Sequence, residues 1–349
     1  MQTLPKTLAP LLLDWYAQNR RDLPWRRDRE PYHVWLSEVM LQQTRVEAVR
    51  GYYARFLAEL PDIASLAACD PDRLHKLWEG LGYYSRVRNL QKAAQVIIRD
   101  YSGQFPSDFD AIRALPGVGD YTAGAIGSIC FELPTPAVDG NVLRVLARIM
   151  ADETPINRMD AKKEAAVRLR EIYPAGRCGD FTQSLMELGA TVCVPNGAPH
   201  CGACPVCTHC LAHTHSCELT LPKKDAKKPR RIEEKTAFLF VCNDACAVRK
   251  RPDKGLLAGL WELPNVDSTL SPQQALDTAA TFGVQPRELL RSVDRQHIFT
   301  HIVWNIRCYT IRCAVAASCF TWADRARFAQ DVALPTAFRQ FLDVDAALS

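Results

Sequence analysis

Apolar residues recur at intervals of three and four positions from Leu8 to about Leu188, which is the spacing of one face of an α-helix. The alternation of apolar and polar residues that is typical of a half-buried strand is nearly absent from this part. The pattern therefore predicts successive helices and a mainly helical first domain over residues 1–221. The spacing is clearest in two groups, Val34, Trp35, Val39, Met40 and Val46, and Leu143, Val145, Leu146 and Ile149.

The last third of the chain has a different pattern, in which strand-like segments flank a helical one. The segments TAFLFVCNDACAVRKR (236–251) and HIVWNIRCYTIRCAVA (301–316) predict paired strands. A helix is expected between them, near residues 271–282, and another close to the C-terminus. Residues 236–349 are therefore expected to form a smaller α+β domain.

The two expected domains are joined by PKKDAKKPRRIEEK (222–235), whose only apolar residues are Ala226 and Ile232. Its two prolines and many charges predict an exposed linker. This segment contains 7 lysines and arginines against 3 acidic residues, whereas the net charge of the whole chain is only +4. Residues 1–221 contain 24 lysines and arginines against 25 acidic residues, so a surface of the first domain that binds an anionic partner must come from cations sorted onto one face.

The length of 349 residues and the hydrophobic content of 48% are enough for two domains that each bury a core. The composition excludes collagen, a coiled coil and wholesale disorder, and no apolar run approaches the roughly 18 residues of a membrane span. Residues 1–16 lack the features of a signal peptide. We therefore expect a soluble, cytoplasmic protein.

Six of the 14 cysteines lie within residues 193–217, which predicts a metal site rather than disulfides. The thiols of a C-x7-C-x2-C-x5-C pattern would hold a tetrahedral Zn²⁺ or a [4Fe–4S] cluster, and spacing alone does not choose between them. An alternative ligand set is the uninterrupted C-x2-C-x2-C-x2-C run, which includes Cys207, and nearby histidines keep zinc open. The four thiols of the first pattern are Cys193, Cys201, Cys204 and Cys210, and the histidines are His209, His213 and His215.

The segment LPGVG (115–119) lies between two helical patterns. Its glycines permit a positive φ and leave backbone N–H groups bare at the start of the next helix, where a phosphate can bind. The alternative is an ordinary glycine-rich turn between helices. With the residues that follow it, LPGVGDYTAGAI (115–126) resembles the helix-hairpin-helix of base-excision DNA glycosylases, which implies that Gly117, Val118 and Gly119 bind DNA.

Taken singly, Glu38 predicts a solvated helix face and Asp139 predicts a helix N-cap. The segments around them nevertheless resemble MutY-type adenine DNA glycosylases, and this resemblance covers nearly all of residues 10–212. The segments that share it are RRDLPWR (20–26), WLSEVMLQQTR (35–45), GLGYYSR (80–86), VDGNVLRVLAR (138–148) and ELGA (187–190).

The resemblance implies a helix-hairpin-helix domain with an iron–sulfur cluster loop, and an enzyme that flips adenine out of duplex DNA opposite 8-oxoguanine or guanine. It also implies a monomer that is associated with the nucleoid if the source is bacterial. Glu38 matches the acid that protonates adenine, and Asp139 matches the carboxylate that stabilises the cationic sugar. Tyr121 and Asn141 match residues that support this network. The family's cluster is ligated by C-x6-C-x2-C-x5-C, which implies the ligands Cys193, Cys201, Cys204 and Cys210 with one extra residue in the first gap. The family's adenine pocket is matched by Trp25, Arg26 and Gln183. Its DNA and lesion contacts are matched by Gln42, Gln43, Thr44, Leu81 and Tyr83.

One position separates the branches of this superfamily. The bifunctional endonuclease III branch has a lysine nucleophile two residues after the hairpin glycine, where this chain has Tyr121. The sequence therefore predicts a glycosylase without lyase activity. Two alternatives stay open: a bifunctional glycosylase/lyase, and a DNA-lesion-binding protein without catalysis.

The C-terminal segments KGLLAGLWELP (254–264) and QHIFTH (296–301) resemble the Nudix-like lesion-recognition domain of the same family. The best-placed stretch for a Nudix metal site, residues 276–284, lacks the paired glutamates, so binding rather than hydrolysis is expected. The family's Phe-Ser-His reader loop is matched by Phe299, Thr300 and His301, for which packing at a strand turn is the alternative.

Overall fold

The computed structural model describes residues 3–226 and 228–342. The described residues leave out residues 1–2 and 343–349, at the ends of the two predicted domains, and residue 227 of the predicted linker. The described chain forms two compact units: residues 3–68 with 89–226, and residues 69–88 with 228–342. Within these residues, no helix is both long and apolar enough to cross a membrane.

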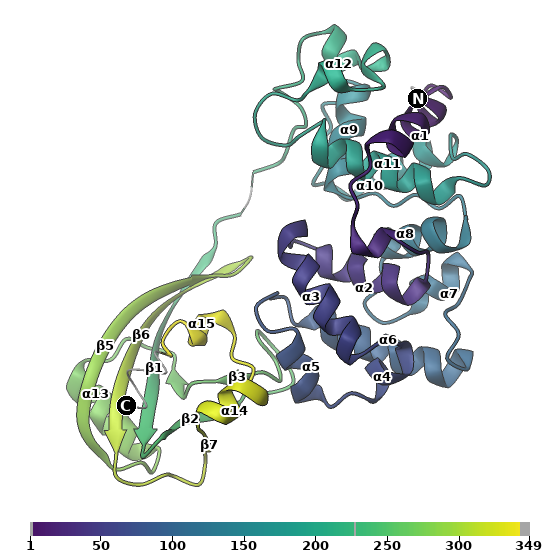
Figure 1. Ribbon diagram of the computed structural model, residues 1–349. Helices are drawn as coiled ribbons and strands as arrows, with labels where there is room; N and C mark the ends of the chain where they lie inside the picture. Colours follow the sequence, from purple (N-terminus) through teal and green to yellow (C-terminus); the bar gives the residue numbers. More distant parts are fainter. Residues whose placement is uncertain (1–2, 227, 343–349) are drawn as a thin grey trace. The chain divides into compact units, whose positions relative to one another are not determined.

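The first unit is helical, as the apolar spacing predicts (Figure 1). Strands are absent from its described residues. Helix α6 begins in the segment that belongs to the second unit, and α5 lies wholly within that segment. The helices before the cysteine-rich loop are α1 (Leu8–Asn19), η1 (Pro24–Arg26), α2 (Pro31–Leu41), α3 (Val46–Glu59), α4 (Ile63–Ala68), α5 (Pro71–Leu77), α6 (Ser85–Tyr101), α7 (Phe109–Ala114), α8 (Asp120–Phe131), α9 (Gly140–Ile149), α10 (Met159–Arg170) and α11 (Cys178–Thr191).

The main core of the first unit lies between α1, α9, α10 and α11. Leu12, Leu146 and Leu188, one from each of three of these helices, are almost completely buried within it. Burial of one such side chain contributes roughly 1.5–3 kcal/mol to folding. Because α9 and α11 are fixed by this core, the residues at their ends occupy defined positions at the site described below.

The turn between α7 and α8 has the predicted location, but only one of its glycines has a positive φ. Gly117 has a φ of 77°, and a Cβ there would lie 2.5 Å from the Cβ of Asn89. Gly119 has a φ of −101° and is the N-cap of α8. The expectation of a left-handed conformation is therefore wrong for Gly119, because its extended backbone is accessible to any residue.

The second unit contains a mixed seven-stranded sheet with the main order β3-β2-β1-β6-β5. Strands β1 and β6 are parallel, with Arg231 opposite Ile302, while β5 and β2 pair antiparallel to their neighbours. The elements are β1 (Arg231–Cys242), β2 (Ala245–Lys250), β3 (Trp261–Glu262), β4 (Asn265–Val266), α13 (Pro272–Thr281), β5 (Pro286–Ile298), β6 (Ile302–Cys313), β7 (Thr321–Ala323), α14 (Arg325–Gln330) and α15 (Thr336–Arg339).

The two faces of β1 are buried against different helices because successive side chains of a strand point to opposite faces. Phe238 and Phe240 pack in one cluster with Ala275 of α13, whereas Leu239 packs in another with Phe338 of α15. Figure 1 shows α13 beside the long strands of the sheet. The α+β prediction for this part of the chain is confirmed, and helix α13 has a capping box formed by Ser271 and Gln274.

One sequence-based expectation is wrong here, and one strand was not predicted. Residues 231–235 of the predicted linker are the first part of β1, and Lys235 is buried with its ammonium group on Asp267. Strand β5 escaped prediction because most of its side chains are exposed, so its sequence lacks a buried face. Both strands form because β6 pairs with each of them. The boundaries of the two domains stay predictions.

Candidate active site

A cavity of about 650 Å³ lies in the first unit, and it is lined by all the residues that sequence analysis assigned to catalysis and to the adenine pocket. Helix α2 contributes Glu38, the first turn of α8 contributes Tyr121, and the start of α9 contributes Asp139 and Asn141. Trp25 and Arg26 reach the cavity from η1, and Gln183 reaches it from α11.

Glu38 is a buried carboxyl group, only 7% exposed, on a helix whose other side chains are mostly apolar. Its pKa is raised to about 7, mainly by burial and to a smaller extent by the nearby Asp139. The hydroxyl of Tyr121 donates a hydrogen bond to Glu38 Oε2 at 2.5 Å, which acts in the opposite direction. Burial and the two carboxyl groups also raise the pKa of Tyr121 well above its ordinary value, so this phenol stays a donor.

Asp139 has the capping role that its sequence context predicts, and it also faces the cavity. Its Oδ1 accepts from the backbone N–H of Val142 at 2.7 Å, while its Oδ2 accepts from Asn141 Nδ2 at 2.9 Å. Burial raises the pKa of Asp139, whereas these hydrogen bonds lower it. The N-cap and the site residue are therefore the same side chain.

Arg144 fixes the orientation of Asn141, and sequence reasoning did not assign it a role. Its guanidinium donates to Asn141 Oδ1 at 2.8 Å and to the carbonyl of Gly189 at 2.6 Å. Because the Asn141 oxygen is held by Arg144, the amide nitrogen faces Asp139. A Cβ at Gly189 would lie 2.6 Å from the Cβ of Asn141, so glycine is needed where α11 crosses α9.

Glu187 is a second residue whose role sequence reasoning missed, although its segment was part of the family resemblance. Its side chain is 0% exposed and accepts from Arg21 at 2.7 and 2.8 Å and from Arg26 at 2.8 Å. Burial opposes its ionisation, but these hydrogen bonds outweigh burial and lower its pKa to about 2. The signal in the sequence is a glutamate within the apolar run of α11, between Met186 and Leu188.

The predicted adenine pocket is built from one aromatic and two polar side chains. Trp25 is buried and packs edge-on against Tyr53, with ring centroids 5.5 Å apart. Gln183 Oε1 accepts from the hydroxyl of Tyr16 at 3.0 Å, which leaves its amide nitrogen as the donor toward the cavity. Together with Arg26, these groups give the cavity an aromatic side chain beside hydrogen-bonding groups, which are the features that recognition of a flipped base uses.

Other predicted DNA contacts divide between the two units. Gln42, Gln43, Thr44, Gly117 and Gly119 line the same cavity, whereas Val118 is buried and does not. Gln43 has a φ of 59°, a left-handed conformation that is uncommon for a residue with a side chain.

The remaining predicted contacts lie in the second unit. The loop between β5 and β6 contains Phe299, Thr300 and His301, and Thr300 and His301 are exposed. Phe299 packs against Trp304 with ring centroids 4.8 Å apart, so the expected strand-turn packing does apply to this residue. Tyr83 is 46% exposed and its hydroxyl lies 3.4 Å from Thr300 Oγ1, whereas Leu81 is buried.

Five thiols line one small cavity at the end of the first unit: Cys193, Cys201, Cys204, Cys207 and Cys210. Burial and neighbouring thiols raise the pKa of Cys201 to about 11 and that of Cys204 to about 12. The buried guanidinium of Arg148 donates to Cys193 Sγ at 3.3 Å, which places one positive charge among these sulfurs. The cysteines of both ligand patterns that the sequence left open line this cavity, whereas Cys217 does not.

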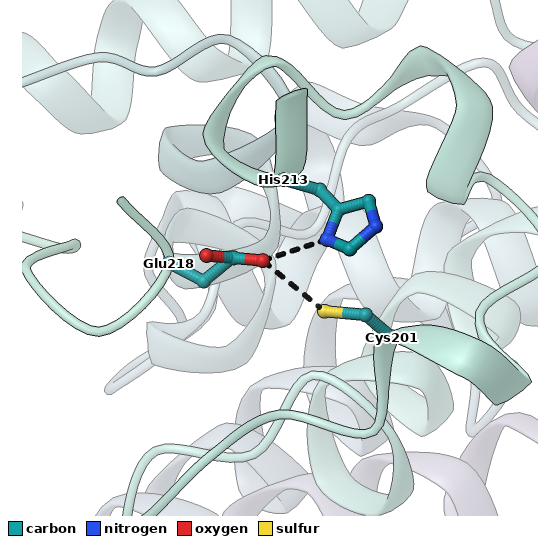
Figure 2. A group of neighbouring side chains, drawn as sticks. All are labelled: Cys201, His213 and Glu218. Carbon is teal, nitrogen blue, oxygen red and sulfur yellow. Dashed lines mark hydrogen bonds and ion pairs between the residues drawn. The ribbon is translucent and has the colours of Figure 1, made fainter. Parts of the chain in front are cut away.

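One group beside this cavity combines sulfur, nitrogen and oxygen donors (Figure 2). Cys201, His213 and Glu218 have donor atoms within 4.8 Å of one another, and His213 Nδ1 lies 2.7 Å from Glu218 Oε1. The other two histidines considered as zinc ligands, His209 and His215, do not line this cavity, and His209 contacts Thr7. The residues at this point thus offer five thiols, one imidazole and one carboxylate.

Comparisons with known proteins match both parts of the chain to protein families. Residues 36–171 match the HhH-GPD superfamily base excision DNA repair protein family, and residues 236–344 match the NUDIX domain family. The chain is 36% identical to the adenine DNA glycosylase of Mus musculus over 95% of this chain and 77% of that protein. It is 37% identical to the adenine DNA glycosylase of Homo sapiens over 85% of this chain and 65% of that protein.

Solved structures support the fold of the first unit. A thermostable thymine-DNA glycosylase matches with a TM-score of 0.55 and 29% identity, over 60% of this chain and 96% of that chain. An endonuclease III in a non-covalent complex with DNA matches with a TM-score of 0.51 and 25% identity, over 61% of this chain and 98% of that chain. Both therefore correspond in extent to the helical part rather than to the whole chain.

Proposed function

Because the chain belongs to the adenine DNA glycosylase family, we propose that it is a base-excision repair enzyme that hydrolyses the N-glycosidic bond of adenine mispaired with 8-oxoguanine or guanine. The proposal rests above all on one observation. The cavity contains a buried carboxyl group, Glu38, with a pKa near 7, beside a second carboxyl group, Asp139. An acid that stays partly protonated near neutral pH and an adjacent carboxylate are the two groups that this hydrolysis needs.

In the mechanism, adenine leaves the duplex and enters the cavity between Trp25 and Gln183. Glu38 donates its proton to the base, which turns adenine into a neutral leaving group as the bond to the sugar breaks. Asp139 stabilises the positive charge that develops on the sugar until water adds to it. Tyr121 and Asn141 hold the two carboxyl groups in place through the hydrogen bonds described above.

Duplex DNA is held by contacts to its phosphates in this proposal. The N-cap Gly119 leaves backbone N–H groups unpaired at the start of α8, where an anion is stabilised. Lys162 is an exposed cation that lines the cavity, and it was not predicted from the sequence. The exposed residues Thr300 and His301 are proposed to read the base opposite adenine.

We further propose that the cysteine cavity holds one [4Fe–4S] cluster, with Cys193, Cys201, Cys204 and Cys210 as ligands. The residues present fit this group, because thiols outnumber all other donors there and Arg148 compensates a thiolate charge. When bound, the cluster supplies metal–thiolate bonds that cross-link the loop after α11 to itself. A zinc ion on Cys201, His213 and Glu218 is the alternative, and metal analysis distinguishes the two.

A single-turnover assay tests the proposed reaction. The purified protein should release adenine from an A:8-oxoguanine duplex and leave the DNA strand intact, and borohydride should trap no covalent complex. The bifunctional alternative has one observation in its favour, since Lys162 lines the cavity. Efficient trapping by the unmodified protein that disappears in Lys162→Ala would establish a lyase, and binding without adenine release would establish a lesion-binding protein.

The rate of excision should fall as the pH rises through about 7, because Glu38 must be protonated to act as the acid. Tyr121→Phe removes a hydrogen bond that lowers the pKa of Glu38. The falling limb of its pH–rate profile should therefore lie at higher pH. Single-turnover rates measured across this range give the position of the limb. Tyr173→Phe is the control, because the hydroxyl of Tyr173 bonds Thr182 outside the cavity. This variant should leave the falling limb at the same pH as in the unmodified protein. A limb that stays fixed in Tyr121→Phe would contradict the assignment of this pKa to Glu38.

Thr300→Val should weaken binding to an A:8-oxoguanine duplex by about fivefold, or roughly 1 kcal/mol, because it keeps the shape and removes the hydroxyl. Thr300→Ser should bind nearly as well as the unmodified protein, and binding to an A:G duplex should barely change in either variant. Equilibrium binding to the two duplexes measures the difference. Equal losses on both duplexes would mean that Thr300 does not distinguish the lesion.

A further inference from the structure

The loop from Cys201 to Cys210 has a cysteine at every third residue, and its backbone forms turns with the same period. The N–H of Cys204 donates to the carbonyl of Cys201 at 3.1 Å, and the N–H of Cys207 donates to that of Cys204 at 3.2 Å. The N–H of Cys210 donates to the carbonyl of Cys207 at 3.0 Å. Such turns bring side chains three residues apart to the same side. All four thiols of the run accordingly line one cavity.

The fifth thiol of the cavity, Cys193, is held firmly by the helices beside it. Its Sγ accepts from Arg148 at 3.3 Å and its carbonyl accepts from Arg144 at 2.8 Å. Its N–H donates to the carbonyl of Leu188 at 2.7 Å. Since a cubane cluster takes four thiolates, a site with five thiols has one more than it needs.

We propose that Cys207 is a spare cluster ligand, which takes the place of Cys210 when that thiol is removed or released. This inference rests on the cluster proposed above. In the exchange, the Cys207 thiol loses its proton as its sulfur bonds to iron, and the released Cys210 thiolate takes up a proton. The cluster keeps its charge and its oxidation state.

The position of the two cysteines explains why they exchange with each other. Cys207 begins the single turn η3 (Cys207–His209), and Cys210 follows it directly, so only this turn has to move. Cys193 and Cys204 pack against the main helical core, which keeps them in place. Cys210 is buried in a small separate cluster with Ala212 and Leu221, and its thiol contacts the carbonyl of Arg148 at 3.4 Å, so its exchange requires η3 to move as a unit.

Iron content and visible absorption of the purified full chain test this inference. The unmodified protein, Cys207→Ala and Cys210→Ala should each retain about four irons with absorption near 400 nm. The iron and the absorption should both be lost in Cys204→Ala and in the double variant Cys207→Ala/Cys210→Ala. Cys217→Ala, whose thiol is outside the cavity, is the matched control and should resemble the unmodified protein. Alanine is used because a serine oxygen can itself bind iron.

The decisive comparison is between the single variants Cys210→Ala and Cys204→Ala, with far-ultraviolet circular dichroism as the check of folding. Loss of iron from Cys210→Ala as complete as that from Cys204→Ala would overturn the spare ligand while leaving the cluster itself established. Loss of iron from Cys207→Ala would also overturn it, since Cys207 would then be an obligatory ligand. A colourless unmodified protein with zinc would instead refute the proposed cofactor.

Discussion

Glu38→Gln should lower the rate of base release by about 10²–10⁴-fold while leaving the affinity for an A:8-oxoguanine duplex unchanged. The glutamine oxygen still accepts the hydrogen bond from Tyr121, so the geometry of the cavity is preserved. Its amide cannot donate the proton that makes adenine a leaving group, and loss of a general acid costs about 10²–10⁴-fold in rate. Single-turnover excision and equilibrium binding, measured on the same duplex, separate the two effects.

The matched control for this variant is Glu47→Gln, a carboxyl group on α3 whose side chain is 83% exposed and outside the cavity. It should excise adenine at the normal rate. Near-normal excision by Glu38→Gln would remove Glu38 from the role of acid. A parallel loss of binding in Glu38→Gln would show instead that the carboxyl group organises the cavity.

Asp139→Asn should lower the excision rate by about 10²–10³-fold, because the amide has no charge to stabilise the cationic sugar. Asparagine is as good an N-cap as aspartate, so the hydrogen bond from Val142 and the stability of α9 should persist. The same single-turnover assay gives the rate, and thermal unfolding gives the stability.

Asp108→Asn provides the control for the capping role of Asp139. Asp108 is the N-cap of α7, accepts from Ala111 N–H at 3.0 Å and lies outside the cavity. This variant should change neither excision nor stability. If Asp139→Asn excised adenine normally, the carboxylate would be a cap and not part of the catalytic pair.

The amino-acid sequence by itself determined the features that depend on local signals. The three- and four-residue apolar spacing of the first unit predicted its helices, because an amphipathic helix repeats its buried face at that interval. Ser271 and Pro272 marked the start of α13, where a capping box satisfies backbone N–H groups. The aspartate before Gly140 predicted the N-cap of α9, which the structure contains. Each of these signals involves residues within a few positions of one another.

Only the tertiary structure decided the features that depend on residues far apart in the chain. The pKa of Glu38 is set by burial and by Tyr121, 83 positions away, so the sequence around Glu38 predicts an ordinary exposed carboxyl group. Glu187 is ionised because two arginines about 160 positions earlier surround it. Strand β5 and the first residues of β1 are ordered by pairing with β6 and not by their own patterns. Burial, charge and strand pairing are properties of the assembled fold, and a local pattern does not contain them.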